Sequence, residues 1–195
     1  MFNFQELIDV IIMTLALGYI FRDAFRKPEY HHYDPLEALR HIRQSTAWQD
    51  FQFAAMITAP AIILHELAHK FVAMGFGLQA TFHASYSFLA LGILLKLLNF
   101  PFIFFIPGYV SHSMAASPWQ AALIAGAGPF TNLALWLVCQ ALLRSKAFMR
   151  THRSWHAALF LSSRINIFLF IFNMLPIPFF DGGQFYVSIY HAIVG

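Results

Sequence analysis

The stretch FQFAAMITAPAIILHELAHKFVAMGF, residues 51–76, decides the fold of this chain. It is apolar and long enough to cross a bilayer as one helix. Close to its centre stands the metal-binding pattern His65-Glu66-Leu67-Ala68-His69. Residues four positions apart lie on one face of a helix, so His65 and His69 direct two imidazoles at one point. The stretch therefore predicts a membrane-spanning helix that supplies two metal ligands.

The whole chain has the composition of an integral membrane protein. Hydrophobic residues make up 59% of it and charged residues 11%, against about 25% charged residues in an average soluble domain. The net charge of +3 comes from basic residues gathered in two loops between apolar runs, which is typical of membrane topology and not of nucleic-acid binding. The single cysteine, Cys139, excludes an internal disulfide and a thiolate metal cluster. We expect the lipid bilayer as a partner and no nucleic acid.

The first 50 residues differ in kind from the rest, because they hold seven of the nine acids. We expect a membrane anchor helix from about Asn3 to Phe21, then a polar connector, residues 22–50, and a second unit over residues 51–195. Within the connector, Asp34 would cap a short helix, Leu36–Arg43. His31 and His32 are interpreted as a solvated loop pair and not as metal ligands.

Further apolar runs complete the predicted elements. Residues 119–143 and 157–175 are long enough to span, whereas Gln184–Val194 is too short. Leu78–Ser87 is expected to form a short strand. Phe88–Phe105 is apolar but interrupted by Lys96, Asn99 and Pro101.

The distribution of basic residues sets the parity of the membrane crossings. The two loops rich in Lys and Arg, residues 22–50 and 144–153, should lie on the same, cytoplasmic side. The helices 51–76 and 119–143 supply two crossings between them, so residues 78–118 must cross twice or not at all. The helix 157–175 then runs parallel to the helix 51–76. Asp181, which follows it, can therefore reach the depth of His65 and His69.

From residue 51 to the C-terminus the chain contains two carboxylates, Glu66 and Asp181. An acid in apolar surroundings costs free energy unless it is protonated, paired or bound to a cation. Glu66 is turned about 100° from His65 and is expected to reach a metal-bound water molecule rather than the metal itself. Zinc sites that hydrolyse amides commonly take a carboxylate as third ligand and leave one position open. By elimination Asp181 is the candidate for the third ligand of a single zinc ion, and a turn-forming Asp-Gly-Gly is the alternative interpretation.

The residues around Asp181 fit a hydrolytic centre. Pro176 and Pro178 forbid a regular helix and predict extended backbone there. Asn173 either donates a hydrogen bond to a developing oxyanion or has a packing role, and the residues alone leave both open. Asn166 on the same helix face is expected to bond between helices.

Two further features complete the hypothesis of a peptide hydrolase. In the first, Glu66 takes a proton from water and returns it to the leaving amine. In the second, a strand edge around Gln79–Tyr86 holds an unwound substrate segment. The motif that contains Gly126, Gly128 and Asn132 is assigned to close helix packing.

Three motifs together resemble the site-2 protease family of intramembrane zinc metalloproteases. They are His65-Glu66-Leu67-Ala68-His69, Gly126-Ala127-Gly128-Pro129 with Asn132, and Asn173-Met174-Leu175-Pro176-Ile177-Pro178 ending at Asp181-Gly182-Gly183. The resemblance covers about residues 51–185. It implies an all-α polytopic membrane protein with a three-helix catalytic core (51–76, 119–143 and 157–178). An extra N-terminal helix and a short strand or re-entrant segment would be added to that core, in a minimal form without a PDZ or CBS domain.

The resemblance also implies roles for particular residues. It carries zinc ligation onto His65, His69 and Asp181, the catalytic base onto Glu66, and a transition-state or substrate contact onto Asn173. The implied activity is intramembrane proteolysis of transmembrane protein substrates in a multi-pass protein of the plasma membrane. Many family members run the HExxH helix inward, whereas the charge count here runs it outward. Neither oligomeric state nor substrate follows from the sequence.

Two rival functions compete with this expectation. A membrane zinc-binding or transport protein can also place HExxH on a helix, but transporters usually need polar ligands at several depths, and this chain has almost no further acids beyond residue 51. A membrane protease of the prenyl-protein type would take a glutamate as third ligand, and no glutamate follows Glu66.

Overall fold

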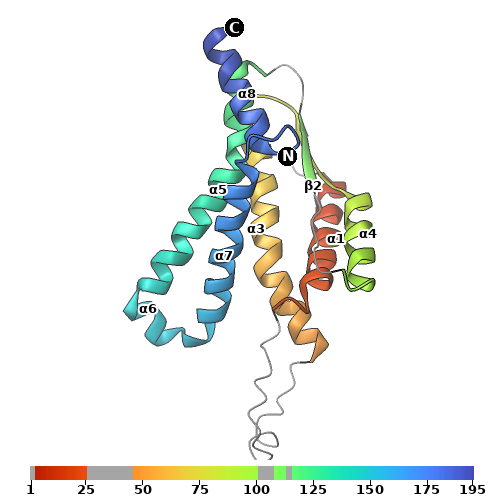
Figure 1. Ribbon diagram of the computed structural model, residues 1–195, viewed down its shortest axis with the longest axis vertical. Coiled ribbons are helices and arrows are strands. Elements are labelled where there is room, and N and C mark those ends of the chain that lie inside the picture. Colours follow the sequence, from red (N-terminus) through yellow and green to blue (C-terminus); the bar gives the residue numbers. More distant parts are fainter. Residues whose placement is uncertain (1–2, 26–45, 101–107, 113–115) are drawn as a thin grey trace, which may run out of the picture.

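The computed structural model describes residues 3–25, 46–100, 108–112 and 116–195. The expected helix Leu36–Arg43, with His31 and His32, lies outside these residues. In chain order the elements are α1 (Phe4–Phe21), α3 (Ala47–Gly75), β1 (Ala80–Ala84), α4 (Tyr86–Leu97), β2 (Gly108–His112), α5 (Pro118–Arg144), α6 (Lys146–Thr151), the 3-10 turn η1 (Arg153–Trp155), α7 (His156–Asn173) and α8 (Asp181–Val194) (Figure 1).

Four segments of the described chain are helical, long and apolar enough to cross a membrane. They are α1, α3, α5 and the stretch Arg153–Asn173, which contains η1 and α7. These are the four spans that the apolar runs predict, so the all-α polytopic fold is confirmed. At 29 residues, α3 is roughly 43 Å long and exceeds the hydrocarbon thickness of a bilayer.

Two helices begin before the residues at which the apolar runs start, because capping boxes fix their N-termini. At α3, Thr46 Oγ1 accepts from the amide of Gln49, and the Gln49 side chain accepts from the amide of Thr46, both at 3.3 Å. Ser117 and Gln120 make the same reciprocal pair at α5. Each pair satisfies amides that have no partner inside the helix. Hydropathy does not detect these polar caps. The two helices therefore begin at residues 47 and 118 and not at residues 51 and 119, where the apolar runs begin.

The helices α3, α5 and α7 form one side of the molecule, and α1 with α4 lies on the other side of α3 (Figure 1). The first residues of α3 and the turn through α6 lie at the same end, while α5 begins at the opposite end (Figure 1). Helices α3 and α7 therefore run parallel. This is the arrangement that the parity of the basic loops predicts.

Between α3 and α5, strand β1 and helix α4 lie along α1. The amides of Phe82 and Ala84 contact the first turns of α1 at Glu6 and Asp9, and Lys96 near the end of α4 contacts the carbonyls of Tyr19 and Ile20 near its last turn. Strand β2 then pairs antiparallel with β1. With 12 residues, α4 is too short to span the membrane by itself. Because β2 returns to pair with β1, the segment between α3 and α5 adds no net crossing of the membrane.

The backbone before Asp181 differs from the prediction of an extended segment. The amide of Ile177 donates to the carbonyl of Leu175 at 2.8 Å, and the amide of Phe180 donates to Ile177 at 2.9 Å. The two prolines exclude helix but are compatible with these tight turns. Helix α8 starts at Asp181 itself, so the spanning path is broken beside the candidate ligand.

Candidate metal centre

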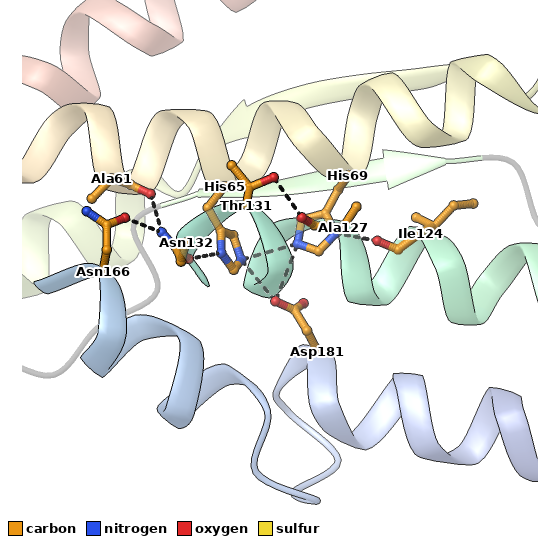
Figure 2. Close-up of polar contacts among 9 residues, drawn as sticks. All are labelled: Ala61, His65, His69, Ile124, Ala127, Thr131, Asn132, Asn166 and Asp181. Atoms are coloured by element: carbon orange, nitrogen blue, oxygen red, sulfur yellow. Dashed lines mark hydrogen bonds and ion pairs between the residues drawn. The ribbon is translucent and has the colours of Figure 1, made fainter. Parts of the chain in front are cut away.

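His65 and His69 project from the same face of α3, as the four-residue spacing predicts. Their Nε2 atoms lie 3.2 Å apart, and both side chains are buried. Figure 2 shows the two imidazoles converging between α3, α5 and the start of α8. Two buried ring nitrogens this close together are unfavourable unless a third group or an ion lies between them.

Asp181 brings a carboxylate to the same point from a distant part of the chain. Its Oδ2 atom lies 2.9 Å from Nε2 of His65 and 3.3 Å from Nε2 of His69. Three ligand atoms bound to one zinc ion at about 2.0–2.1 Å lie roughly 3.3 Å from one another. Within the described residues, His65, His69 and Asp181 form the one group of His, Cys, Asp or Glu side chains spaced to hold a metal ion.

The other ring nitrogens have partners that settle the tautomers. His65 Nδ1 lies 2.6 Å from Oδ1 of Asn132, and His69 Nδ1 lies 2.6 Å from the carbonyl oxygen of Ile124. Both partners are acceptors, so each Nδ1 carries the proton and each Nε2 presents a lone pair. Two lone pairs and a carboxylate that face one another need a cation between them. The donor set therefore fits a zinc ion.

Asn132, which the sequence assigned to packing, contacts the candidate ligand His65. Its side chain is completely buried, and its amide nitrogen donates to the carbonyl of Ala61 and to Oδ1 of Asn166, each at 2.9 Å. These two bonds leave only Oδ1 of Asn132 to face His65. The sequence feature that could have identified Asn132 is the presence of its polar amide within an apolar helix. Asn166 bonds between helices, as expected.

Gly128 leaves the space that the metal requires. A Cβ atom at this position would lie 2.3 Å from Nε2 of His69 and 2.6 Å from Nε2 of His65, which is closer than any non-bonded contact permits. The backbone of α5 thus forms the wall of the cradle opposite Asp181. Close helix packing, the role predicted for Gly128, is correct but incomplete.

Glu66 and Asn173 line the same cavity as the three converging side chains. This cavity, of about 430 Å³, is bounded by α3, β2, α5, α7 and α8 and by Phe21 at the end of α1. Among the described residues the structure gives neither the Glu66 carboxylate nor the Asn173 amide a hydrogen-bond partner, so both groups remain available to a ligand. The sequence placed both residues at one site, and the structure brings them to one cavity.

Comparison with known proteins connects this geometry to a family. The sequence profile described as "Peptidase family M50" matches residues 145–195, a segment that contains α7, α8 and Asp181. A protein of Methanocaldococcus jannaschii named "Putative zinc metalloprotease MJ0611" is 34% identical over 182 residues, which cover 93% of this chain and 83% of the relative. No solved structure gives a significant match.

Proposed function

Because this chain belongs to peptidase family M50, which makes it a zinc metalloprotease, we propose that it cleaves peptide bonds within or near the transmembrane segments of other membrane proteins. The observation that carries the proposal is the position of the metal centre. His65 and His69 lie within a helix that is long and apolar enough to cross a membrane, and Asp181 meets them there. A protease with its centre at this depth acts on substrates that enter the bilayer.

The residues that would hold zinc are His65, His69 and Asp181. When bound, zinc supplies a Lewis acid that polarises a peptide carbonyl and makes water a stronger acid. Asn132 and the carbonyl of Ile124 keep the two imidazoles in the tautomers that ligation needs. The metal site thus depends on three helices, since its ligands and their partners come from α3, α5 and α8.

Glu66 is the proposed proton carrier. It follows His65 directly, so it points away from the ligand direction but still lines the cavity. Its carboxylate accepts a proton from the attacking water and delivers that proton to the leaving amine. Asn173, at the end of α7, is the proposed hydrogen-bond donor to the developing oxyanion.

Within the described residues, the open strand edge beside the cavity belongs to β2 and not to the segment Gln79–Tyr86, where it was expected. The amides of Phe82 and Ala84 in β1 point to α1, so that edge is occupied. Phe82 pairs with Val110 and Ala84 with Gly108. In an antiparallel ladder these partners direct their own backbone groups away from β1. Gly108 and Val110 also line the cavity, so an unwound substrate segment would add to β2.

The test is co-expression of the full chain with a panel of tagged single-span membrane proteins. Wild type should release shortened fragments, while Glu66→Gln should bind zinc equally well and release none. Cleavage by Glu66→Gln would remove Glu66 from the reaction. Zinc flux into proteoliposomes without cleavage of any substrate would favour transport instead.

For localisation we propose the plasma membrane, with the basic segment 144–153, which contains α6, in the cytoplasm. The basic residues Arg144, Lys146, Arg150 and Arg153 support this orientation. A cysteine introduced at Lys146 should resist a membrane-impermeant thiol reagent added to intact cells. Labelling from outside would reverse the orientation.

A further inference from the structure

Two acids of α1 lie buried against the outer edge of strand β1. Glu6 and Asp9 are each about 1% exposed. Glu6 Oε1 accepts from the amide of Phe82 at 2.8 Å, and Asp9 Oδ2 accepts from the amide of Ala84 at 3.3 Å. The three-residue spacing on the helix sets the Cβ atoms of the two acids about 5–6 Å apart, and alternate amides of a strand repeat at about 6.6 Å. One face of α1 therefore matches one edge of β1.

Each carboxylate is held by further donors. Glu6 pairs with the buried ammonium of Lys70, the residue after the candidate ligand His69, and also accepts from the amide of Asn3 at 2.7 Å. Asp9 accepts from the hydroxyl of Tyr86 and from the side-chain amide of Gln5 at 3.1 Å. The contacts of Glu6 thus join α1, α3 and β1 at the level of the metal centre.

Attachment of α1 to the sheet does not by itself require acids. Met13 and Leu17 of α1 already share a buried apolar cluster with Phe82 of β1 and Leu89 of α4. Charged groups at membrane depth are costly and mark a functional demand. Here the amides of Phe82 and Ala84 create that demand, because backbone donors at this depth need hydrogen-bond acceptors from the protein.

We propose that Glu6 and Asp9 are positioning residues that act as a substitute for a third strand. They occupy the outer edge of β1, leave β2 as the single open edge of the described sheet, and hold that edge beside the metal centre for substrate addition. The proposal rests on the proposed function, because it assigns the sheet a substrate.

Loss of the acceptors should weaken substrate binding and leave the chemistry intact. With an unpaired outer edge, β1 shifts towards other acceptors and moves β2 with it through the ladder. The expected result for Asp9→Leu is a KM raised roughly five- to tenfold, with kcat and zinc content close to wild type. Asp9→Asn keeps an acceptor oxygen and should recover most of the binding.

Paired variants at Glu6 and Lys70 separate an edge acceptor from a simple ion pair. Exchange of the charges, Glu6→Lys with Lys70→Glu, restores the ion pair but removes the acceptor for Phe82. The neutral pair, Glu6→Gln with Lys70→Gln, removes the charges but keeps an acceptor. The proposal expects a raised KM in the exchange variant and near-normal KM in the neutral pair. The opposite order would overturn it and assign the pair to helix attachment.

Lys96→Met is the matched control for loosening of α1. It removes the contacts of Lys96 with Tyr19 and Ile20 at the far end of the helix and should lower stability without a change in KM. A KM raised equally by Lys96→Met would overturn the proposal.

A second measurement decides the edge role without any substrate. Hydrogen exchange of the full chain in lipid nanodiscs should find the amides of Phe82 and Ala84 protected in wild type. Asp9→Leu should lose protection at Ala84, and unchanged protection would overturn the proposal. If wild type cleaves nothing while exchange behaves as expected, the proposed function fails and the capped edge stands.

Discussion

Oδ1 of Asn132 lies 2.6 Å from Nδ1 of His65, and this contact leaves Nε2 as the free lone pair of the imidazole. Because Asn132 also donates to Ala61 and Asn166, its amide cannot rotate without losing two bonds. Asn132 of α5 therefore determines which nitrogen of His65, a residue of α3, is available to a metal ion.

Asn132→Ala should lower zinc affinity about 10- to 100-fold, because loss of the partner of a ligating histidine has effects of this size. Asn166→Ala is the matched control. It removes one bond of Asn132 but leaves the bond to Ala61, so its effect should be smaller. Competition with a chromophoric chelator measures both affinities. Equal affinities in wild type and Asn132→Ala would mean that His65 is oriented by packing alone.

Gly128→Ala should abolish zinc binding, because the added methyl would overlap Nε2 of both histidines, at 2.3 and 2.6 Å. Gly126→Ala, two residues earlier and turned about 200° around α5 from that overlap, is the control. Its methyl would meet side-chain ring atoms of Phe130 and Phe185 at 3.1 Å, which can move aside. Metal analysis of the purified variants decides. Full zinc occupancy in Gly128→Ala would show that α5 is not the wall of the site.

Gly183→Ala should displace Asp181 and reduce both zinc content and cleavage. The new Cβ would lie 2.2 Å from the carbonyl oxygen of Ile177, and relief of such an overlap costs about 1–3 kcal/mol. The turn before Asp181 would have to move, and the carboxylate would move with it. Gly75→Ala is the control, since its Cβ would meet nothing within 4 Å. Normal zinc content in Gly183→Ala would separate the turn from the position of the ligand.

Removal of zinc should lower the thermal unfolding midpoint in detergent micelles. A ligand present at a hundredfold excess over its Kd stabilises the folded state by about 2.7 kcal/mol. Asp181→Ala lacks one of the three ligands, so its midpoint should respond weakly to zinc or to chelator. A wild-type midpoint that is unchanged by chelator would indicate that the site is not loaded under those conditions. A full response in Asp181→Ala would remove Asp181 from the ligand set.

Much of the fold could be predicted because the relevant signals are local. Length and hydropathy of the runs give the four spanning helices, and the four-residue spacing places His65 and His69 on one face. The parity of the basic loops makes α3 and α7 parallel, which allows Asp181 to reach the histidines. Scarcity of acids beyond residue 51 then leaves Asp181 as the candidate third ligand.

Other features depend on how distant elements cross, and no local pattern encodes that. Asn132 and His65 are 67 residues apart in the chain, and Glu6 and Phe82 are 76 apart. The sequence indicates a polar residue in an apolar helix but not the neighbour that it faces. For this reason the open strand edge was expected at 79–86, although α1 covers β1, and in the described part of the chain the free edge belongs to β2.

The sequence by itself determined that the chain spans a membrane and carries a His-Glu-His pattern with one distant acid, because hydrophobicity and helical period act over a few residues. Only the tertiary structure decided which nitrogen of His65 is free, why position 128 must lack a side chain, and which strand faces the cavity. These depend on the angles and depths at which the helices pack, and packing is settled by contacts between residues that the chain keeps far apart.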